Sequence, residues 1–147
     1  MTEKTAVPTL TLGLSAQTSL VVDAAHSASR FTPWALDVFS TPDMIGLMEK
    51  AADIAGQSGL PEGYATVGTK VEVRHLVACP RGWEVTATGT LLSQEGRRLV
   101  FRVECFAGGE KLGEGTHERY IVHRQHFMER TAARWEGKRS QPAPPAY

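Results

Sequence analysis

The sequence contains little cysteine. Cys79 and Cys105 are the two cysteines among its 147 residues. A single pair so far apart matches neither the disulfide framework of a small secreted protein nor the close ligand spacing of a metal site. We therefore expect two free thiols, a reducing cytoplasmic compartment and no bound metal.

The chain also lacks an excess of charge and any long hydrophobic run. Sixteen Lys and Arg residues balance sixteen Asp and Glu residues, so the formal net charge is zero. This balance argues against the strongly basic surface that nucleic-acid-binding domains present. No apolar run approaches the ~18 residues of a membrane-spanning helix, and residues 1–5 lack the apolar core of a signal peptide. We expect neither nucleic acid nor membrane as a partner.

Short catalytic motifs are missing as well. The sequence contains no Walker loop, no CxxC pair, no HExxH and no GxSxG. Gly113-Glu114-Gly115 is an isolated GxG within a strand pattern, which indicates close backbone packing rather than a nucleotide-binding loop. Any chemistry must therefore come from residues that are dispersed along the chain and meet only in the folded protein.

The longest helical pattern lies at residues 40–55. Ser40 or Thr41 can cap its start, and Pro42 suits its first turn. The glycines and the proline of residues 56–61 are expected to end it. Eight apolar side chains fill an arc of roughly 180°, which is broad for a surface helix: Met44, Ile45, Leu47, Met48, Ala51, Ala52, Ile54 and Ala55.

Strand patterns lie on both sides of this helix. Residues 10–16 alternate and predict a strand, whereas residues 23–38 predict an ordered loop or short helical turns over the start of the helix. Four later segments alternate between turns and predict an antiparallel meander: residues 67–79, 83–92, 99–105 and 111–122. In the first segment one face is predicted to be buried, with Val67, Thr69, Val71, Val73, His75, Val77 and Cys79. In the second segment Trp83, Val85, Ala87 and Leu91 share one side.

The predicted elements form one domain at residues 1–135. Residues 1–8 are a loose start, residues 126–135 a short amphipathic helix, and residues 136–147 a disordered tail rich in proline. One broad-faced helix followed by a meander buries its apolar surface only if the sheet wraps around it, which is an α+β arrangement. The outer strands of such a sheet stay open, and this favours pairing of two copies.

Three dispersed polar residues suggest a site. His75 lies on the inward strand face, Glu49 at the edge of the apolar helix face and Thr41 at the helix start. Taken singly they fit a core histidine, a solvated boundary residue and a helix cap. A sheet wrapped on the helix, however, brings its inward histidine toward that helix. A hydroxyl, a carboxylate and an imidazole near a helix N-terminus make a plausible acyl-transfer site.

The same residues resemble a known family. Its motifs match Phe39-Ser40-Thr41, Met44-Ile45-Gly46-Leu47-Met48-Glu49, Val67-Gly68-Thr69 leading to His75, Glu95-Gly96-Arg97-Arg98-Leu99, and Gly115-Thr116-His117-Glu118-Arg119. In this order they are similar to the fluoroacetyl-CoA thioesterase-type hotdog proteins over roughly residues 39–127. The resemblance implies a hotdog fold, with one long central helix wrapped by a curved antiparallel sheet, a homodimer, and hydrolysis of a small or medium acyl-CoA thioester.

The resemblance also implies a site. The family's Thr–Glu–His catalytic set maps onto Thr41, Glu49 and His75, and its glycine and arginine map onto Gly68 and Arg119. The segment before the helix forms a substrate lid in that family. Residues 24–38 depart from the family pattern there, so the fold and reaction carry over better than a fluorinated substrate does.

In the lid segment and just after it, four apolar side chains would shape the acyl pocket: Phe31, Trp34, Leu36 and Phe39. No cofactor is implied, since coenzyme A enters as part of the substrate.

The expected mechanism leaves one choice open. Glu49 either attacks the thioester carbonyl or activates water, while Thr41 positions the substrate or water and His75 gives a proton to the leaving thiolate. Arg119 would hold a carboxylate or the coenzyme phosphates, or else form an ion pair with Glu118 or Glu49; Arg97, Arg98 and Arg124 are further phosphate candidates. Three rival functions remain: a hydratase or dehydratase acting on acyl thioesters, a non-catalytic acyl-CoA-binding module, and a structural dimerisation domain.

Overall fold

The structure is a computed structural model that describes residues 6–139 and 142–145. The chain runs through β1 (Ser15–Val21), two 3-10 turns, η1 (Ala24–His26) and η2 (Ala28–Arg30), then α1 (Thr41–Ser58), β2 (Tyr64–His75), β3 (Glu84–Glu95), β4 (Arg98–Ala107), β5 (Glu110–His123) and α2 (Arg124–Glu136). The expected loose start and disordered tail lie partly outside the described residues.

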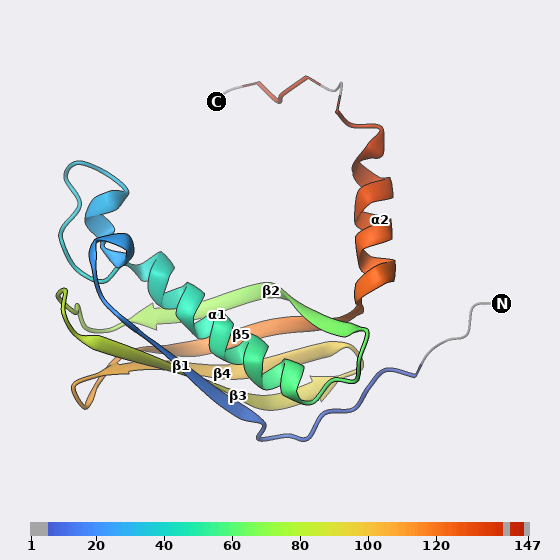
Figure 1. Cartoon of the computed structure of the whole chain (residues 1–147), viewed down its shortest axis with the longest axis horizontal. Coiled ribbons are helices and arrows are strands. Elements are labelled where there is room, and N and C mark those ends of the chain that lie inside the picture. The colour runs from blue at the N-terminus through green and yellow to red at the C-terminus, as the bar shows by residue number, and fades with distance from the viewer. Residues whose placement is uncertain (1–5, 140–141, 146–147) are drawn as a thin grey trace.

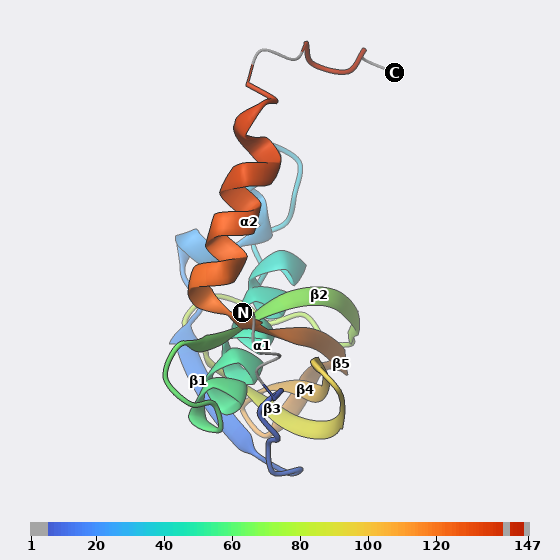
Figure 2. The same ribbon diagram turned by 90° about the vertical axis from the view of Figure 1, so that its right-hand side faces the viewer.

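The five strands form one antiparallel sheet in the order β1-β3-β4-β5-β2. The long helix α1 lies along one face of this sheet (Figure 1). Seen along the helix, the sheet curves around it (Figure 2). This confirms the predicted α+β class, with one long helix wrapped by a curved sheet. The strands β1 and β2 form the two open edges.

Helix α1 begins as its sequence predicts and ends later. Ser40 is the N-cap, and its Oγ accepts the Asp43 amide at 3.0 Å. The helix passes through Gly56 to Ser58, three residues beyond residue 55, and its C-cap is Gly59, one of the residues expected to end it. Gly56 continues the helix because it faces the core, where an added Cβ would touch the Phe101 ring at 3.3 Å.

The buried stripe of α1 is narrower than predicted. It consists of Met44, Leu47, Met48, Ala51, Ala52, Ala55 and Gly56. Ile54, expected inside, is 43% exposed, and Ile45 is half-buried. The sheet therefore covers less than the predicted arc of about 180°.

Glycines let the helix lie very close to the sheet. A Cβ at Gly89 on β3 would stand 2.7 Å from the Ala52 amide nitrogen, which is part of the helix backbone. A Cβ at Gly113 on β5 would stand 2.6 Å from Met44 Sδ. The predicted close packing around Gly113 is present, and the helix packs equally closely against Gly89.

A β-bulge changes which residues of β2 face the helix, so the prediction for this strand was partly wrong. The pairing with β5 shifts register between Gly68 and Lys70, so the inward face changes there from even-numbered to odd-numbered residues. Val67 therefore does not share the inward face of Val71 and His75, contrary to the prediction. The strand also ends at His75 rather than at residue 79. A bulge inserts one residue without changing the alternation of the sequence, which is why the pattern concealed it.

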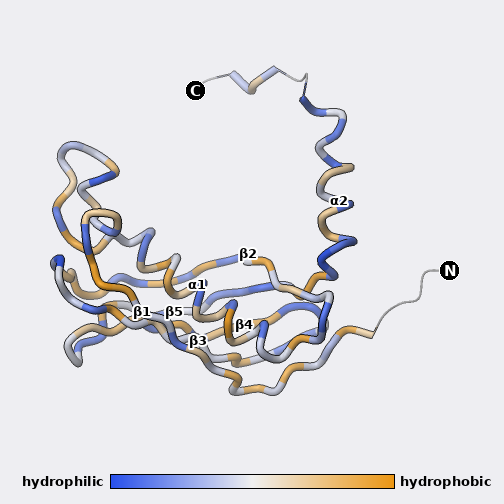
Figure 3. The backbone as a smooth tube through the Cα atoms, in the orientation of Figure 1, coloured by the Kyte–Doolittle hydropathy of each residue, from blue (hydrophilic) through white to orange (hydrophobic). Residues whose placement is uncertain are grey.

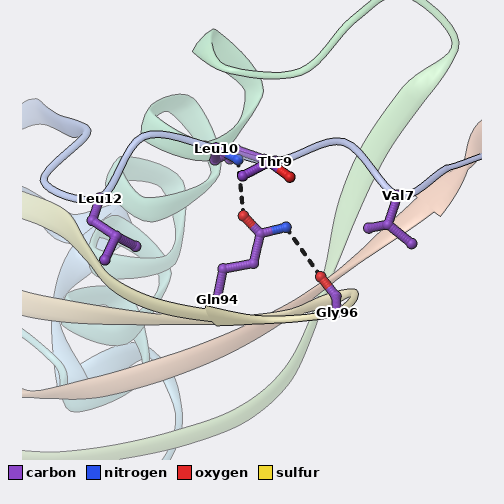
Figure 4. Close-up of a pocket in the computed structure, with 6 residues that line it drawn as sticks. All are labelled: Val7, Thr9, Leu10, Leu12, Gln94 and Gly96. Carbon is purple, nitrogen blue, oxygen red and sulfur yellow. Dashed lines mark hydrogen bonds between the residues drawn. The ribbon is translucent and has the colours of Figure 1, made fainter.

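Two further predictions at strand starts were wrong. The first strand begins at Ser15 rather than at residue 10, because Gly13 adopts a left-handed turn with φ of 91° and Leu12 is 59% exposed. The segment before it is held to the sheet by Gln94, whose Oε1 accepts the Leu10 amide at 2.8 Å (Figure 4). Trp83, expected as the first residue of the next strand, precedes β3 and is 52% exposed.

The predicted short turns over the helix start are present. Residues 24–30 form η1 and η2, and the Arg30 guanidinium contacts both carboxylate oxygens of Asp43 in the first turn of α1, at 2.6 and 3.1 Å. The Ser40 amide donates to His26 O at 2.9 Å. These bonds hold residues 24–40 against the start of the helix.

The predicted C-terminal helix is α2, which leaves the sheet after β5 and has no buried residue (Figures 1 and 2). Figure 3 shows polar and apolar positions alternating along its course. Among the described residues no helix is apolar and long enough to cross a membrane.

The two cysteines are free thiols, both buried in the core. Burial raises the pKa of the Cys79 thiol and raises that of Cys105 to about 11.

The contact between helix and sheet can be tested at Gly89. We expect Gly89→Ala to lower the free energy of unfolding by about 1–3 kcal/mol, because the new methyl group meets helix backbone that cannot rotate away. Gly46→Ala is the matched control: an added Cβ has no atom within 4 Å there, and the helix should gain about 0.5–1 kcal/mol. Urea denaturation measures both, and equal effects would contradict the close-packing explanation.

Candidate active site

Thr41 and His75 meet at one end of the molecule. Thr41 is the first residue of α1 and His75 the last residue of β2, and Thr41 Oγ1 lies 2.8 Å from His75 Nδ1. The inward alternation of β2 after the bulge places His75 on the helix side of the sheet. This contact joins two of the three residues that the sequence singled out.

A cavity of about 300 Å³ opens beside this pair. Phe39, Leu76 and Val77 contribute apolar wall, and Thr41 and His75 contribute the polar atoms. The buried Phe39 ring packs edge-on against the imidazole, with centroids 6.3 Å apart. A small apolar hollow with a few convergent polar groups is the usual form of a small-molecule site.

The second ring nitrogen of His75 has no partner. Within the described part of the chain, Nε2 of His75 is the one buried side-chain nitrogen or oxygen without a hydrogen bond. Such an orphan atom is rare in native cores and often has a functional explanation. Burial lowers the pKa of His75 below its usual 6.5, partly offset by the Val77 backbone. The ring is therefore neutral at pH 7 and has one nitrogen free for proton transfer.

The helix start offers fewer amides than expected. Pro42 has no N–H, and Ser40 Oγ already accepts the Asp43 amide. The Met44 amide donates to Ser40 O at 3.0 Å. The Thr41 amide and hydroxyl thus remain as the donors of this turn that could face a carbonyl oxygen.

Glu49 lies at a second place, next to the bulge of β2. A Cβ built on Gly68 would stand 3.6 Å from Glu49 Oε2 and 3.3 Å from Arg119 Nη1. Gly68 thus leaves open a small space that the Glu49 carboxylate and the Arg119 guanidinium both border. These three residues, all singled out from the sequence, lie together.

Arg119 belongs to a buried polar network. Its side chain is 8% exposed. Nε donates to Thr66 Oγ1 at 2.7 Å, and Nη2 donates to Thr66 O at 3.0 Å and lies 3.4 Å from Asp53 Oδ1. Its ion pair is with Asp53, while Glu118 pairs with Arg98, so the predicted alternative partner Glu118 is wrong. Buried in this way, Arg119 is badly placed to reach coenzyme phosphates in solvent.

His117, Thr66 and Asp53 were missed as members of this network. His117 Nε2 lies 3.0 Å from Arg119 Nη1, and its Nδ1 lies 2.9 Å from Lys70 O. The alternation of His117, Arg119 and Ile121 on β5 was a usable signal, since all three are buried. Thr66 gave no signal, because its inward direction depends on the bulge.

Within one chain, Glu49 does not lie next to His75. Gly68, beside Glu49, and His75 are seven positions apart on β2, which is about 23 Å at about 3.3 Å per residue. The Thr41–His75 pair and the Glu49–Gly68–Arg119 group are therefore separate within a chain. Trp34, expected in the substrate pocket, is 81% exposed and not part of the cavity wall at His75.

Not every hollow carries the groups that catalysis needs. A hollow of about 440 Å³ near the N-terminal segment has no ionisable side chain among its six lining residues (Figure 4). In the described ranges, no three His, Cys, Asp or Glu side chains converge as they would around a metal ion.

Comparison with known proteins identifies a family. A family model described as fluoroacetyl-CoA-specific thioesterase matches residues 22–125. A fluoroacetyl-CoA thioesterase of Streptantibioticus cattleyicolor is 44% identical over 91 residues, which are 62% of this chain and 66%, just under two thirds, of that protein.

Two solved structures show the same fold. A fluoroacetyl-CoA thioesterase is 34% identical with a TM-score of 0.77, and the match covers 85% of this chain and 97% of that one. A hot-dog-like protein from Thermanaerovibrio acidaminovorans is 24% identical with a TM-score of 0.79, covering 86% and 93%.

The lowered pKa values of His75 and His117 predict how the stability of the protein depends on pH. Burial lowers the pKa of His75 and of His117 below 6.5, so the unfolded chain binds more protons than the folded protein as the pH falls through this range. We expect the melting temperature to fall between pH 7.5 and pH 5.5, and His75→Gln to weaken this dependence. The carboxyl groups with a lowered pKa, such as Glu104, titrate below 4.5 and therefore do not contribute to the change between pH 7.5 and pH 5.5. A melting temperature that rises toward pH 5.5 would contradict the assignment.

Proposed function

The chain belongs to the family of fluoroacetyl-CoA-specific thioesterases, which are thioester hydrolases, and we propose that it hydrolyses a small or medium acyl-CoA thioester to the free acid and coenzyme A. The observation that carries this proposal is the Thr41–His75 contact, with a buried, unpartnered ring nitrogen of His75 beside a cavity of about 300 Å³. A cavity of this size favours a short acyl group. The reaction needs no cofactor, because coenzyme A arrives within the substrate.

In this mechanism the thioester carbonyl lies at the start of α1. The Thr41 amide and hydroxyl donate to the carbonyl oxygen as negative charge develops on it, and the positive end of the helix dipole assists. Neutral His75 lies within reach of the same place and transfers a proton between water and the leaving thiolate. Glu49 activates water or attacks the carbonyl, and Gly68 leaves room for the substrate beside this carboxylate.

A second copy of the chain completes the site. Strand β2 is an open edge of the sheet, with Gly68 and His75 placed on either side of its centre. If two β2 edges pair antiparallel about a two-fold axis between Val71 and Glu72, Gly68 of one subunit lies opposite the partner's His75. Each Glu49 then approaches the Thr41–His75 pair of the other subunit. This arrangement accounts for two half-sites that one chain keeps apart.

The cell compartment we propose is the cytoplasm. Both cysteines are free in the fold, which suits a reducing environment.

The activity is tested by a hydrolysis screen over short, branched and aromatic acyl-CoAs, in which a thiol reagent traps released coenzyme A. For the preferred substrate, we expect Glu49→Ala and His75→Ala to lower kcat/KM on the order of 10²–10⁴-fold, as for acid–base residues. Thr41→Ala should be impaired, and Thr41→Ser is its control because it keeps the hydroxyl. Full rates in all three alanine variants would refute the roles; hydration of an enoyl thioester without thioester cleavage would indicate a hydratase.

Shared sites are tested by mixing two inactive variants. A mixed dimer of Glu49→Gln and His75→Ala has one intact and one doubly substituted site if the site spans two subunits. After equal mixing and subunit exchange, half of the dimers are mixed, so about a quarter of wild-type activity should return. Each variant alone, taken through the same exchange, is the control. If no activity returns although mass spectrometry detects mixed dimers, each site is built within a single chain.

A further inference from the structure

His117 is a buried titratable residue that the proposed mechanism does not use. It lies on β5 and is 1% exposed. Nδ1 lies 2.9 Å from Lys70 O at the bulge of β2, and Nε2 lies 3.0 Å from Arg119 Nη1. A carbonyl oxygen can only accept a hydrogen bond and a guanidinium can only donate one. Both contacts are therefore satisfied by one form of the ring, which is neutral with its proton on Nδ1.

One of the N–H groups of Arg119 has no hydrogen-bond partner among the described residues. A guanidinium has five N–H groups. Four of them face Thr66 Oγ1, Thr66 O, Asp53 Oδ1 and His117 Nε2. The fifth belongs to Nη1 and has no partner among the described residues. Nη1 lies 3.3 Å and Glu49 Oε2 3.6 Å from the point where residue 68 would carry a Cβ, so this N–H is next to the space at Gly68.

We propose that His117 is a positioning residue of the thioesterase site: its neutral ring accepts one Nη1–H of Arg119 and thereby presents the other to Glu49 and to substrate at Gly68. This inference rests on the proposed function. The fifth N–H stabilises either the ionised carboxylate of Glu49 or a substrate oxygen in front of Gly68. The His117 ring also borders this space, since its Cε1 lies 3.1 Å from the same Cβ position. Its two nitrogens face Lys70 O and Arg119, so its polar effect on Glu49 passes through Arg119.

The charges around His117 explain why it must stay neutral. Arg119 faces it from β5, Glu49 and Asp53 face it from α1, and the Lys70 backbone faces it from β2. If Nε2 were protonated, its N–H would face the Nη1–H of Arg119, so neither could accept a hydrogen bond. Two positive charges would also lie side by side. The hydrogen bond would be lost and the guanidinium would turn away from Glu49. Burial, the largest effect, and the Arg119 charge both lower the pKa of His117 and oppose this protonation.

Two substitutions separate positioning from packing. His117→Gln keeps an acceptor oxygen that can reach Arg119 but cannot take up a proton. His117→Leu fills the site and removes the acceptor. We expect His117→Leu to lower kcat on the order of tenfold or more with a smaller change in KM, because a misaimed guanidinium disturbs the reacting geometry. His117→Gln should keep a kcat within about threefold of wild type, and His126→Gln, on the exposed surface of α2, is the unaffected control.

A second readout does not depend on catalysis. In protein labelled with 15N at histidine and arginine, we expect a protonated Nδ1 and an unprotonated Nε2 for His117 at pH 7. The Arg119 side-chain N–H signals should be slow to exchange in wild type and in His117→Gln and lost in His117→Leu.

An Nε2–H tautomer, or a folded His117→Leu variant with unchanged kcat and unchanged Arg119 signals, would overturn the proposal. If no acyl-CoA is hydrolysed by wild type, the proposed function fails, while the tautomer and the Arg119 signals still decide whether His117 positions Arg119.

Discussion

The candidate site depends on the short distance between α1 and the sheet. Without side chains at Gly89 and Gly113, the sheet admits the helix backbone at Ala52 and the Met44 sulfur into space that a Cβ would occupy. At this distance Thr41 reaches His75 at one end of the helix, and Glu49 borders the space at Gly68 two turns further on. A bulkier residue at either glycine would lift both functional groups of the helix off the sheet together.

The two histidines that face the helix have opposite surroundings. His75 has one nitrogen on a hydroxyl and the other unpartnered beside a cavity. His117 has partners at both nitrogens and is sealed from solvent. A ring of the first kind can exchange a proton with a substrate, and a ring of the second kind can only hold its neighbours in place. The same residue type thus suits catalysis at the end of β2 and orientation on β5, beside the middle of β2.

The sequence predicted the residues that alternate regularly and missed those whose direction depends on irregular backbone. Leu99, Phe101, Val103 and Cys105 are all buried as expected, and the N-cap of α1 lies at Ser40. The bulge at Gly68 was not visible, because an inserted residue leaves the strand alternation intact on either side. Since the bulge sets the direction of Thr66, the hydrogen bonds between Thr66 and Arg119 could not be predicted from the sequence either. The wrapped sheet was expected to bring His75 toward the helix that carries Glu49. Within one chain the length of β2 between Gly68 and His75 keeps the two side chains apart.

The burial of Cys79 and Cys105 has a practical effect on how this enzyme is handled. Thiol reagents react with the thiolate, and a cysteine held in the core with a pKa of about 11, as for Cys105, offers almost none near neutrality. The native protein should therefore contribute little background colour when a disulfide dye records coenzyme A release. It should also withstand substrates that alkylate or oxidise cysteine and would inactivate an enzyme with an exposed, acidic cysteine.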